Sequence, residues 1–93
     1  MVKLDMMRYD VGSIVQSRAG KDKGMFFVVS KIEHNFVFLV DGKKRTLSKP
    51  KKKKNRHLIV CQQCSELKEK FAKAQYMLDS EIKSVLRNFK LNM

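Results

Sequence analysis

The chain has 93 residues and a formal net charge of +12, and 43% of its residues are apolar. This length allows one small domain with a thin core, and the apolar content excludes a globally disordered chain. A net charge of this size indicates a polyanionic partner, above all a nucleic acid. No apolar run reaches the roughly 18 residues of a membrane span, and charged residues interrupt the region where a secretory signal needs an apolar stretch.

The positive charge is concentrated in the first part of the chain. Residues 1–57 carry 15 basic and 5 acidic side chains, whereas residues 58–93 carry 6 and 4. The surface that meets a polyanion is therefore expected within residues 1–57. Two cysteines are too few for a disulfide framework, and we expect a cytoplasmic protein.

Five short strands are predicted before residue 61. β-Branched and aromatic side chains mark residues 11–17, 25–32 and 36–40 as strands. A fourth strand is expected over residues 43–49, ended by a proline, and a fifth over residues 57–60. Short strands at this spacing favour a small barrel. The second and third strands are apolar on both faces, so one face would fill the barrel and the other would need a cover.

Two connections between these strands have turn chemistry. His34-Asn35 can form a two-residue turn because asparagine tolerates positive φ. Asp41-Gly42 predicts a type I′ hairpin, which would join the third strand directly to the fourth.

The connection between the first two strands is a loop bounded by glycines. Gly20 and Gly24 bracket Lys21, Asp22 and Lys23. Glycines at these points let the backbone approach a partner closely and turn the lysines outward. Asp22 is interpreted as a turn-forming or lysine-orienting group rather than a catalytic base. An ordinary surface turn with solvated lysines is the alternative.

Two helices are predicted after the strands, and they would supply the cover. Ser65 is a suitable N-cap for the first, and the second would begin at Asp79 or Ser80. We therefore divide the chain into a barrel with a basic tail, residues 1–60, and a helical appendage, residues 61–93. Apolar residues recur at helical spacing: Leu67, Phe71, Ala74 and Leu78 in the first helix, and Ile82, Val85, Leu86 and Phe89 in the second.

Three segments in this order resemble the KOW motif. Residues 11–32 read as an apolar strand, a Gly-Lys-Asp-Lys-Gly loop and a second apolar strand, with Gly24 at the position of the signature glycine. Together with the later DGK-x-R and P-K-x-K patterns, the chain is similar to small bacterial KOW-domain RNA-binding proteins related to a large-subunit ribosomal protein of archaea and eukaryotes. The residues that carry this likeness are Ser17, Ala19, Gly20, Asp22, Gly24, Asp41, Gly42, Lys43, Arg45 and residues 50–57.

The resemblance implies a mainly β fold with C-terminal α structure, an SH3-like small barrel of KOW type with one or two helices. It implies binding of RNA, often ribosomal RNA, in translation or ribosome assembly. The glycine loop and the basic segment would form the interface, with Gly20, Asp22, Gly24, Asp41 and Gly42 as structural residues. The expected RNA-binding residues are Arg18, Lys21, Lys23, Lys43, Lys44, Arg45, Lys49, Lys51, Lys52, Lys53, Lys54, Arg56 and His57.

The basic segment, residues 43–57, holds nine Lys or Arg and no acidic residue. Lysines contact phosphates as point charges and give affinity rather than specificity, whereas Arg45 and Arg56 suit bidentate or stacking contacts. Folded or double-stranded RNA is the expected target because it is read by shape and phosphate position. The alternatives are a disordered solubilising tail, a nuclear localisation signal or a membrane-surface segment.

The Cys-Gln-Gln-Cys sequence admits three interpretations. His57, Cys61 and Cys64 could be three zinc ligands, with His34 or a partner supplying the fourth. The two cysteines could instead form a redox pair, although the usual βαβ pattern is missing. Two reduced thiols in a linker is the interpretation we favour, and no metal or cofactor is expected.

No catalytic set is evident in the sequence. There is no glycine-rich phosphate loop before a helix and no pair of acids on one face, so an enzyme is not expected. All six phenylalanines lie in apolar runs and are expected in the core. The main functional alternative is a protein-interaction module, in which Ile82, Val85 and Phe89 would meet a protein partner and the basic segment would be a targeting or solubility tail.

Overall fold

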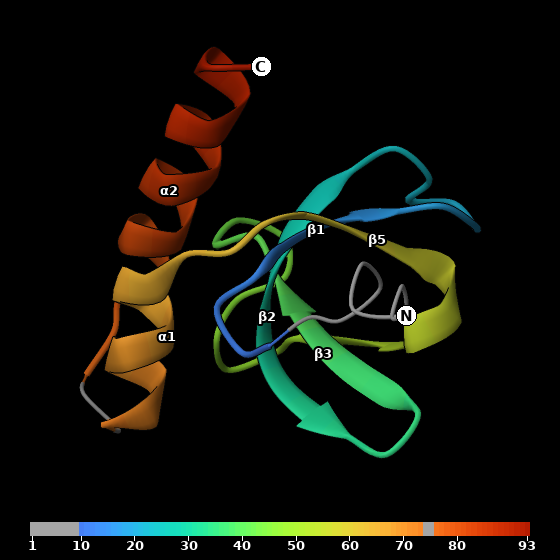
Figure 1. Ribbon diagram of the computed structural model, residues 1–93, viewed down its shortest axis with the longest axis horizontal. Coiled ribbons are helices and arrows are strands. Elements are labelled where there is room, and N and C mark those ends of the chain that lie inside the picture. Colours follow the sequence, from blue (N-terminus) through green and yellow to red (C-terminus); the bar gives the residue numbers. More distant parts are fainter. Residues whose placement is uncertain (1–9, 74–75) are drawn as a thin grey trace, which may run out of the picture.

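The computed structural model describes residues 10–73 and 76–93 as one antiparallel sheet with two helices beside it (Figure 1). The protein is therefore mainly β with C-terminal helices. The sheet has five strands in the order β4-β3-β2-β1-β5. The elements are β1 Ile14–Ser17, β2 Phe26–Glu33, β3 Phe36–Val40, β4 Lys51–Lys54, the 3₁₀ turn η2 Asn55–His57, β5 Leu58–Gln62, α1 Ser65–Ala72 and α2 Asp79–Leu91.

The sheet is strongly curled because consecutive strands lie at its opposite edges. β4 and β5 are the two edge strands, yet only η2 separates them in sequence. A connection from Lys54 to Leu58 spans at most about 14 Å, so the two edges converge at this turn. Backbone hydrogen bonds hold η2 in place, from Arg18 N to His57 O at 2.8 Å and from Asn55 N to Asn35 O at 2.9 Å. Among the described residues no ladder joins β4 to β5, so the sheet is not closed.

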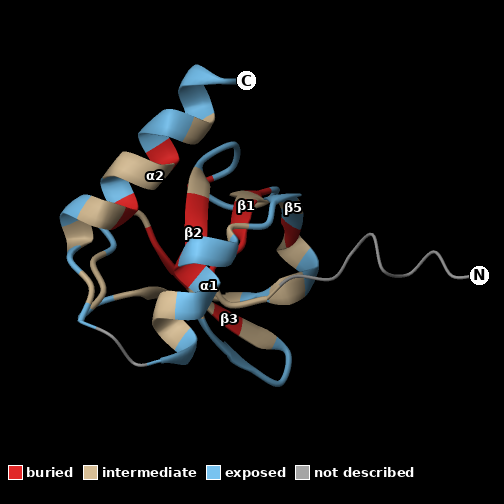
Figure 2. Ribbon diagram, turned by 60° about the vertical axis from the view of Figure 1, so that its left-hand side comes forward, coloured by how far each residue is buried: buried red, intermediate tan, exposed pale blue. Residues whose placement is uncertain are grey.

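Apolar side chains cover both faces of the sheet, as the sequence predicted for the second and third strands. Figure 2 shows the buried residues, in red, along the strands and on the helices. One cluster lies inside the curl and belongs to the strands alone. The other lies on the opposite face, where both helices cover it. The inner cluster contains Val15, Phe27, Val29, Val37, Leu39 and Leu58, and the helix-covered cluster contains Ile14, Val28, Val40, Leu67, Ile82 and Leu86.

Two glycines let the helices sit directly on the backbone. A Cβ on Gly12 would lie 2.7 Å from the Lys68 nitrogen of α1. A Cβ on Gly42 would overlap the Asp79 carbonyl oxygen at the start of α2. Both glycines have positive φ, +94° and +79°, so the conformation and the close approach each require glycine.

The predicted fourth strand was wrong in its position. Residues 43–49 form a looped segment whose only bridge is between Thr46 and Lys49, and β4 begins after Pro50. The Asp41 side chain explains the difference. Its Oδ1 accepts hydrogen bonds from the backbone N–H of Lys43 at 2.8 Å and Arg45 at 2.9 Å. This local bonding competes with a strand ladder.

The turn at Asp41-Gly42 is therefore not a type I′ hairpin. Gly42 has positive φ but Asp41 does not. At the other predicted turn, His34-Asn35 does connect β2 to β3, and the positive φ of 49° falls on His34 rather than Asn35.

The remaining element boundaries differ by a few residues. β1 begins at Ile14 rather than at residue 11, because the positive φ of Gly12 interrupts the extended backbone. β5 runs to Gln62, past the expected domain boundary at residue 60. The two predicted helices are confirmed, and α2 begins at Asp79 as expected. The N-cap of α1 is Cys64 rather than Ser65, which is the first helical residue, and Leu78, expected in the first helix, is the N-cap of α2. Ala74 lies outside the described residues. Neither helix in the described part of the chain has the length and apolar character needed to cross a membrane.

Candidate nucleic-acid interface

A buried carboxylate joins the glycine loop, residues 18–24, to the edge of the sheet. The Asp22 side chain accepts a hydrogen bond from Ser17 Oγ at 2.6 Å. Lys53 Nζ lies 2.9 Å from Asp22 Oδ1, and Lys51 Nζ lies 2.9 Å from Oδ2. Lys53 also donates to the Ala19 carbonyl at 3.0 Å. The loop is thus fixed to β4 by two ammonium groups.

The contacts of Asp22 keep it ionised. Burial by itself would raise the pKa of this carboxyl, because a low-dielectric site disfavours the charged form. The Ser17 hydroxyl and the ammonium groups of Lys51 and Lys53 outweigh burial, and the pKa falls well below its usual value. Asp22 was expected to orient lysines. The lysines it contacts belong to β4, not to the flanking positions 21 and 23.

The four lysines of β4 divide into two pairs because side chains alternate across a strand. Lys51 and Lys53, the inner lysines, point toward Asp22, and their side chains are 25% and 10% exposed. Lys52 and Lys54, the outer lysines, are exposed on the opposite face. The two pairs therefore meet different surroundings although their sequence is uniform.

Two phenylalanines of the neighbouring strand β3, Phe36 and Phe38, pair with the outer lysines of β4 and lie outside the apolar clusters. Lys52 Nζ lies 4.5 Å from the Phe36 ring centroid and 5.9 Å from that of Phe38. Lys31 Nζ lies 5.5 Å from the Phe38 centroid. The prediction that all six phenylalanines are core residues was therefore wrong for Phe36 and Phe38, which are half-buried beneath lysines.

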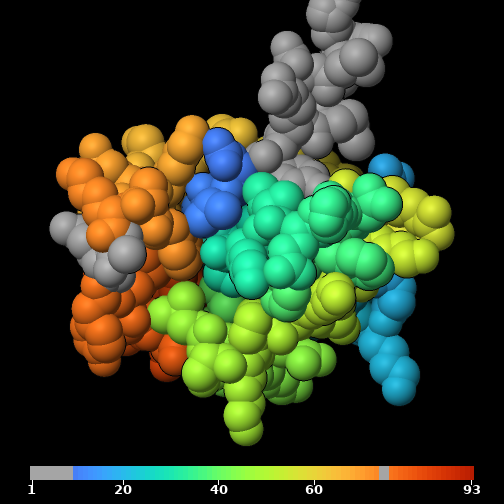
Figure 3. Space-filling model, turned by 90° about the horizontal axis from the view of Figure 1, so that it is seen from below, coloured from blue at the N-terminus to red at the C-terminus, as the bar shows by residue number. Residues whose placement is uncertain are grey.

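The glycine loop presents its cations to solvent on a backbone fixed by internal hydrogen bonds. Gly24 N donates to Ser17 O at 2.8 Å, and Met25 N donates to Asp22 O at 2.9 Å. A Cβ on Gly24 would meet no atom within 4 Å, so the surface beside it is open. Figure 3 shows this loop, in sky blue, projecting from the body of the molecule. The exposed cations of the loop are Arg18, Lys21 and Lys23.

The segment 43–49 is also held at its backbone while its cations face solvent. Asp41 N and Gly42 N both donate to Arg45 O, at 2.8 and 3.1 Å. Leu47 N donates to Asp79 Oδ1 of α2 at 2.8 Å, which attaches the segment to the helix. The exposed cations here are Lys43, Lys44, Arg45 and Lys49. Arg56 of η2 is exposed, and its Nε lies 3.5 Å from Nε2 of the half-buried His57.

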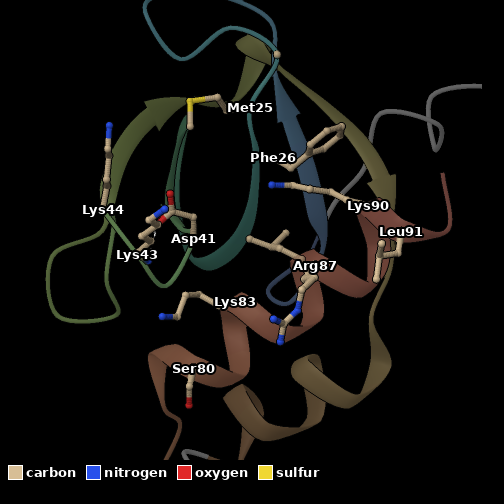
Figure 4. Close-up of a pocket in the computed structure, with 12 residues that line it drawn as sticks. Met25, Phe26, Asp41, Lys43, Lys44, Ser80, Lys83, Arg87, Lys90 and Leu91 are labelled. Atoms are coloured by element: carbon tan, nitrogen blue, oxygen red, sulfur yellow. Dashed lines mark hydrogen bonds between the residues drawn. The ribbon is translucent and has the colours of Figure 1, made fainter.

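Three cations of α2 were missed by the sequence analysis. Lys83, Arg87 and Lys90 are exposed and line a groove of about 1060 Å³ between α2 and the segments 24–26 and 41–44 (Figure 4). The three cations are four and three residues apart, which places them on one face of the helix, away from the apolar stripe, so the sequence could have predicted this basic face. The low net charge of residues 58–93 hid this basic face, because the acidic residues that balance the total lie on α1 and in the first turn of α2 and not beside the three cations.

The acidic residues near this surface are occupied by internal contacts. Asp22 binds the inner lysines, Asp41 accepts two backbone N–H groups, and Asp79 accepts a third. They leave the exposed cations of the loop, the segment 43–49, the outer face of β4 and the groove without an ion pair to any described side chain. These cations are therefore exposed charges without a direct ion pair, on backbone segments fixed by hydrogen bonds. The exposed Glu33 carboxylate, which pairs with Lys31, acts on Lys52 only at longer range.

Neither the two cysteines nor the apolar stripe of α2 is part of this basic surface. Partial burial raises the pKa of the exposed Cys61 thiol, and Cys64 packs beside the helix-covered cluster. No group of three or more His, Cys, Asp or Glu in residues 10–73 and 76–93 is arranged to hold a metal, so His57, Cys61 and Cys64 are not brought together as ligands. The stripe considered for a protein partner faces the sheet: Ile82 is fully buried, and Val85 and Phe89 pack against the same cluster.

Comparison with known proteins does not assign this surface to a family. The chain matches no family model and no curated protein. The chemistry of the exposed residues is therefore the basis for a function.

Proposed function

We propose that this protein binds folded RNA, such as ribosomal RNA, in the translation or ribosome-assembly machinery of the cytoplasm. One observation carries the proposal. The exposed cations stand on backbone segments fixed by hydrogen bonds, and the neighbouring carboxylates are already engaged inside the protein. Such a surface is preorganised for an extended polyanion, because few side-chain contacts have to be broken before phosphates bind.

Binding would proceed mainly by exchange of counterions for lysines. Each phosphate neutralised by a lysine releases condensed counterions, which makes the affinity salt-dependent. Lys21, Lys23, Lys52 and Lys54 are exposed and suited to this role. The arginines suit planar, bidentate contacts with phosphates or stacking on bases. The backbone of Arg45 is fixed on both sides, because its N–H donates to Asp41 Oδ1 and its carbonyl accepts from Asp41 N and Gly42 N.

We also propose that the fold is an SH3-like barrel of KOW type. A curled five-stranded antiparallel sheet whose edges converge supports this proposal, although no ladder between the described strands β4 and β5 closes the sheet. The glycine loop lies between β1 and β2, at the place where the KOW pattern puts it. Gly20 and Gly24 both have positive φ, as a glycine-dependent loop requires.

The distribution of charge favours RNA over the alternatives. Membrane-surface binding commonly uses one amphipathic basic helix with an exposed apolar face, whereas here the cations are spread over loops, a strand and a helix. A protein-interaction role through α2 has less support because its apolar stripe is used to cover the sheet.

The test is RNA binding measured against salt for matched charge variants. Purified protein is titrated with ribosomal RNA and with an RNA hairpin at several salt concentrations. Lys52→Gln with Lys54→Gln should lower the magnitude of the log–log slope by roughly one to two. Lys68→Gln with Lys73→Gln, the α1 pair, removes the same number of positive charges at α1. Lys68 pairs with Asp10 on the exposed surface at 2.8 Å and Lys73 is the exposed C-cap of the helix, so this variant should change the slope little. No binding of either RNA at low salt would overturn the proposal.

A further inference from the structure

The groove beside α2 has features that differ from the rest of the basic surface. It combines cations from two sides with apolar walls. Lys83, Arg87 and Lys90 come from α2, and Lys43 and Lys44 come from the facing segment. Figure 4 shows Lys83 and Lys90 extending from the helix toward the facing strands.

The apolar walls of the groove are accessible to a ligand. Met25 is 46% exposed and Leu91 is 75% exposed. Phe26 lies between them and the core, with its ring in edge contact with Phe89 at a centroid distance of 5.3 Å. These side chains offer apolar surface beside the cations, and the thioether of Met25 adds a polarizable group.

The charge of the groove selects an anionic occupant. Its single acidic residue, Asp41, accepts two backbone hydrogen bonds from Lys43 and Arg45 and forms no direct ion pair with a described cation, so the five cations of the groove outnumber one carboxylate. An occupant that satisfies the whole groove must present regularly spaced negative charges together with flat apolar surface.

On this basis we infer that the groove holds an unpaired, single-stranded stretch of RNA, with phosphates against Lys83, Arg87 and Lys90 and bases against Met25 and Leu91. A duplex presents phosphates and sugars but keeps its base faces stacked inside, whereas unpaired nucleotides offer both chemistries. The inference rests on the proposed RNA-binding function and adds the class of RNA element recognised.

The position of the groove supports this assignment. Gly24 and Met25 line one end of it, so the groove begins where the glycine loop ends. A folded RNA seated on the glycine loop could therefore continue into the groove through an adjoining unpaired segment. The two surfaces would then read one RNA that contains a junction between paired and unpaired nucleotides.

The experiment compares three probes on the full chain: oligouridine, an oligomer of the same length with abasic residues, and an RNA hairpin. Arg87→Gln with Lys90→Gln should lower the salt slope for oligouridine by about 1.4, from two lost contacts at about 0.7 each. The same variant should affect the hairpin less. The α1 pair Lys68→Gln with Lys73→Gln serves as the charge-matched control, and thermal unfolding checks that every variant is folded.

A second variant tests the apolar wall without changing charge. Met25→Ala should weaken oligouridine binding by about two- to tenfold, the range expected for loss of sulfur–ring contacts. It should leave binding of the abasic oligomer unchanged, because that probe has no bases to contact.

The outcomes separate the inference from the proposed function. If the wild type binds the hairpin but the α2 and α1 pairs affect oligouridine equally, the inference fails and RNA binding stands. Equal losses on oligouridine and hairpin would also overturn it, since the groove would then be a general phosphate surface. Displacement of oligouridine by polyglutamate with the same dependence on Met25 would assign the groove to acidic peptides. Failure to bind any RNA would remove the proposed function itself.

Discussion

Lys53 of β4 and Asp22 of the glycine loop form an ion pair at 2.9 Å between residues 31 positions apart in the sequence. Both side chains are about nine-tenths buried, and Lys51 completes the contact from the same face of the strand. Two of the four lysines of β4 therefore have a structural role, and their contacts with Asp22 attach the glycine loop to the edge of the sheet.

Replacing Asp22 with asparagine should destabilise the protein by about 2–4 kcal/mol. The change keeps the side-chain volume and the hydrogen bond with Ser17 but leaves two ammonium groups partly buried without a counter-charge. Urea unfolding measures the difference. Glu33→Gln is the control, because Glu33 pairs with Lys31 on the exposed surface, where such pairs contribute little. Similar costs for the two variants would contradict the structural role of Asp22.

The stabilisation by Asp22 should depend on pH in a defined direction. Its pKa is lowered in the folded state, so the unfolded chain binds more protons than the folded chain at intermediate acidity. The stabilisation is fully present above the usual carboxyl pKa of about 4 and is lost as the pH falls from there through the lowered folded value. The difference in unfolding free energy between wild type and Asp22→Asn should therefore be constant from pH 7 to about 5 and shrink below about 4. A difference that stays constant into this acid range would show that Asp22 acts by shape alone.

The two pairs of lysines in β4 should respond oppositely to the same chemical change. Lys51→Gln with Lys53→Gln leaves the buried Asp22 charge unpaired and should lower the melting temperature by roughly 8–16 °C, which corresponds to about 2 kcal/mol. Lys52→Gln with Lys54→Gln should leave the melting temperature within a few degrees and reduce the salt dependence of RNA binding instead. Calorimetry and RNA titration on both double variants provide the comparison. Equal changes in melting temperature and in salt slope for the two variants would contradict the separate roles of the inner and outer lysines.

Gly42→Ala should cost more stability than Gly24→Ala, although both glycines have positive φ. A side chain at Gly24 meets no neighbour, so only the backbone preference is lost, at about 1–2 kcal/mol. At Gly42 the methyl group would also collide with the Asp79 carbonyl and Lys83, and we expect at least about 1–3 kcal/mol more. Denaturant unfolding of the two variants tests this order. Equal costs would show that α2 shifts easily away from the turn.

The pattern of apolar residues was sufficient to predict much of the fold. Strands β2 and β3 are apolar on both faces, which required a second layer, and the helical spacing after Ser65 supplied it. The position of β4 could not be read in the same way. Four identical lysines have no apolar alternation, and their inward and outward orientation depends on Asp22, which is distant in the sequence.

The candidate site was predictable only where charges are contiguous in the sequence. The segment 43–57 was found because its cations are neighbours along the chain. The groove was not, since Lys83 and Lys90 meet the segment 41–44 only after Gly42 packs on the first turn of α2. The spacing of the cations along α2 could be read from the sequence, but their position opposite the segment 41–44 could not, because it depends on long-range packing.

The placement of β4 at the edge of the sheet has a consequence for self-association. An edge strand exposes backbone groups that can pair with a strand of another molecule and extend into aggregates. Here every side chain of that edge is a lysine, two of them turned inward to Asp22 and two projecting outward. A second chain adding to this edge would bring its own β4, with the same charges, against it. Substituting neutral β-forming residues in β4 would therefore make the protein prone to precipitate even where the fold survived.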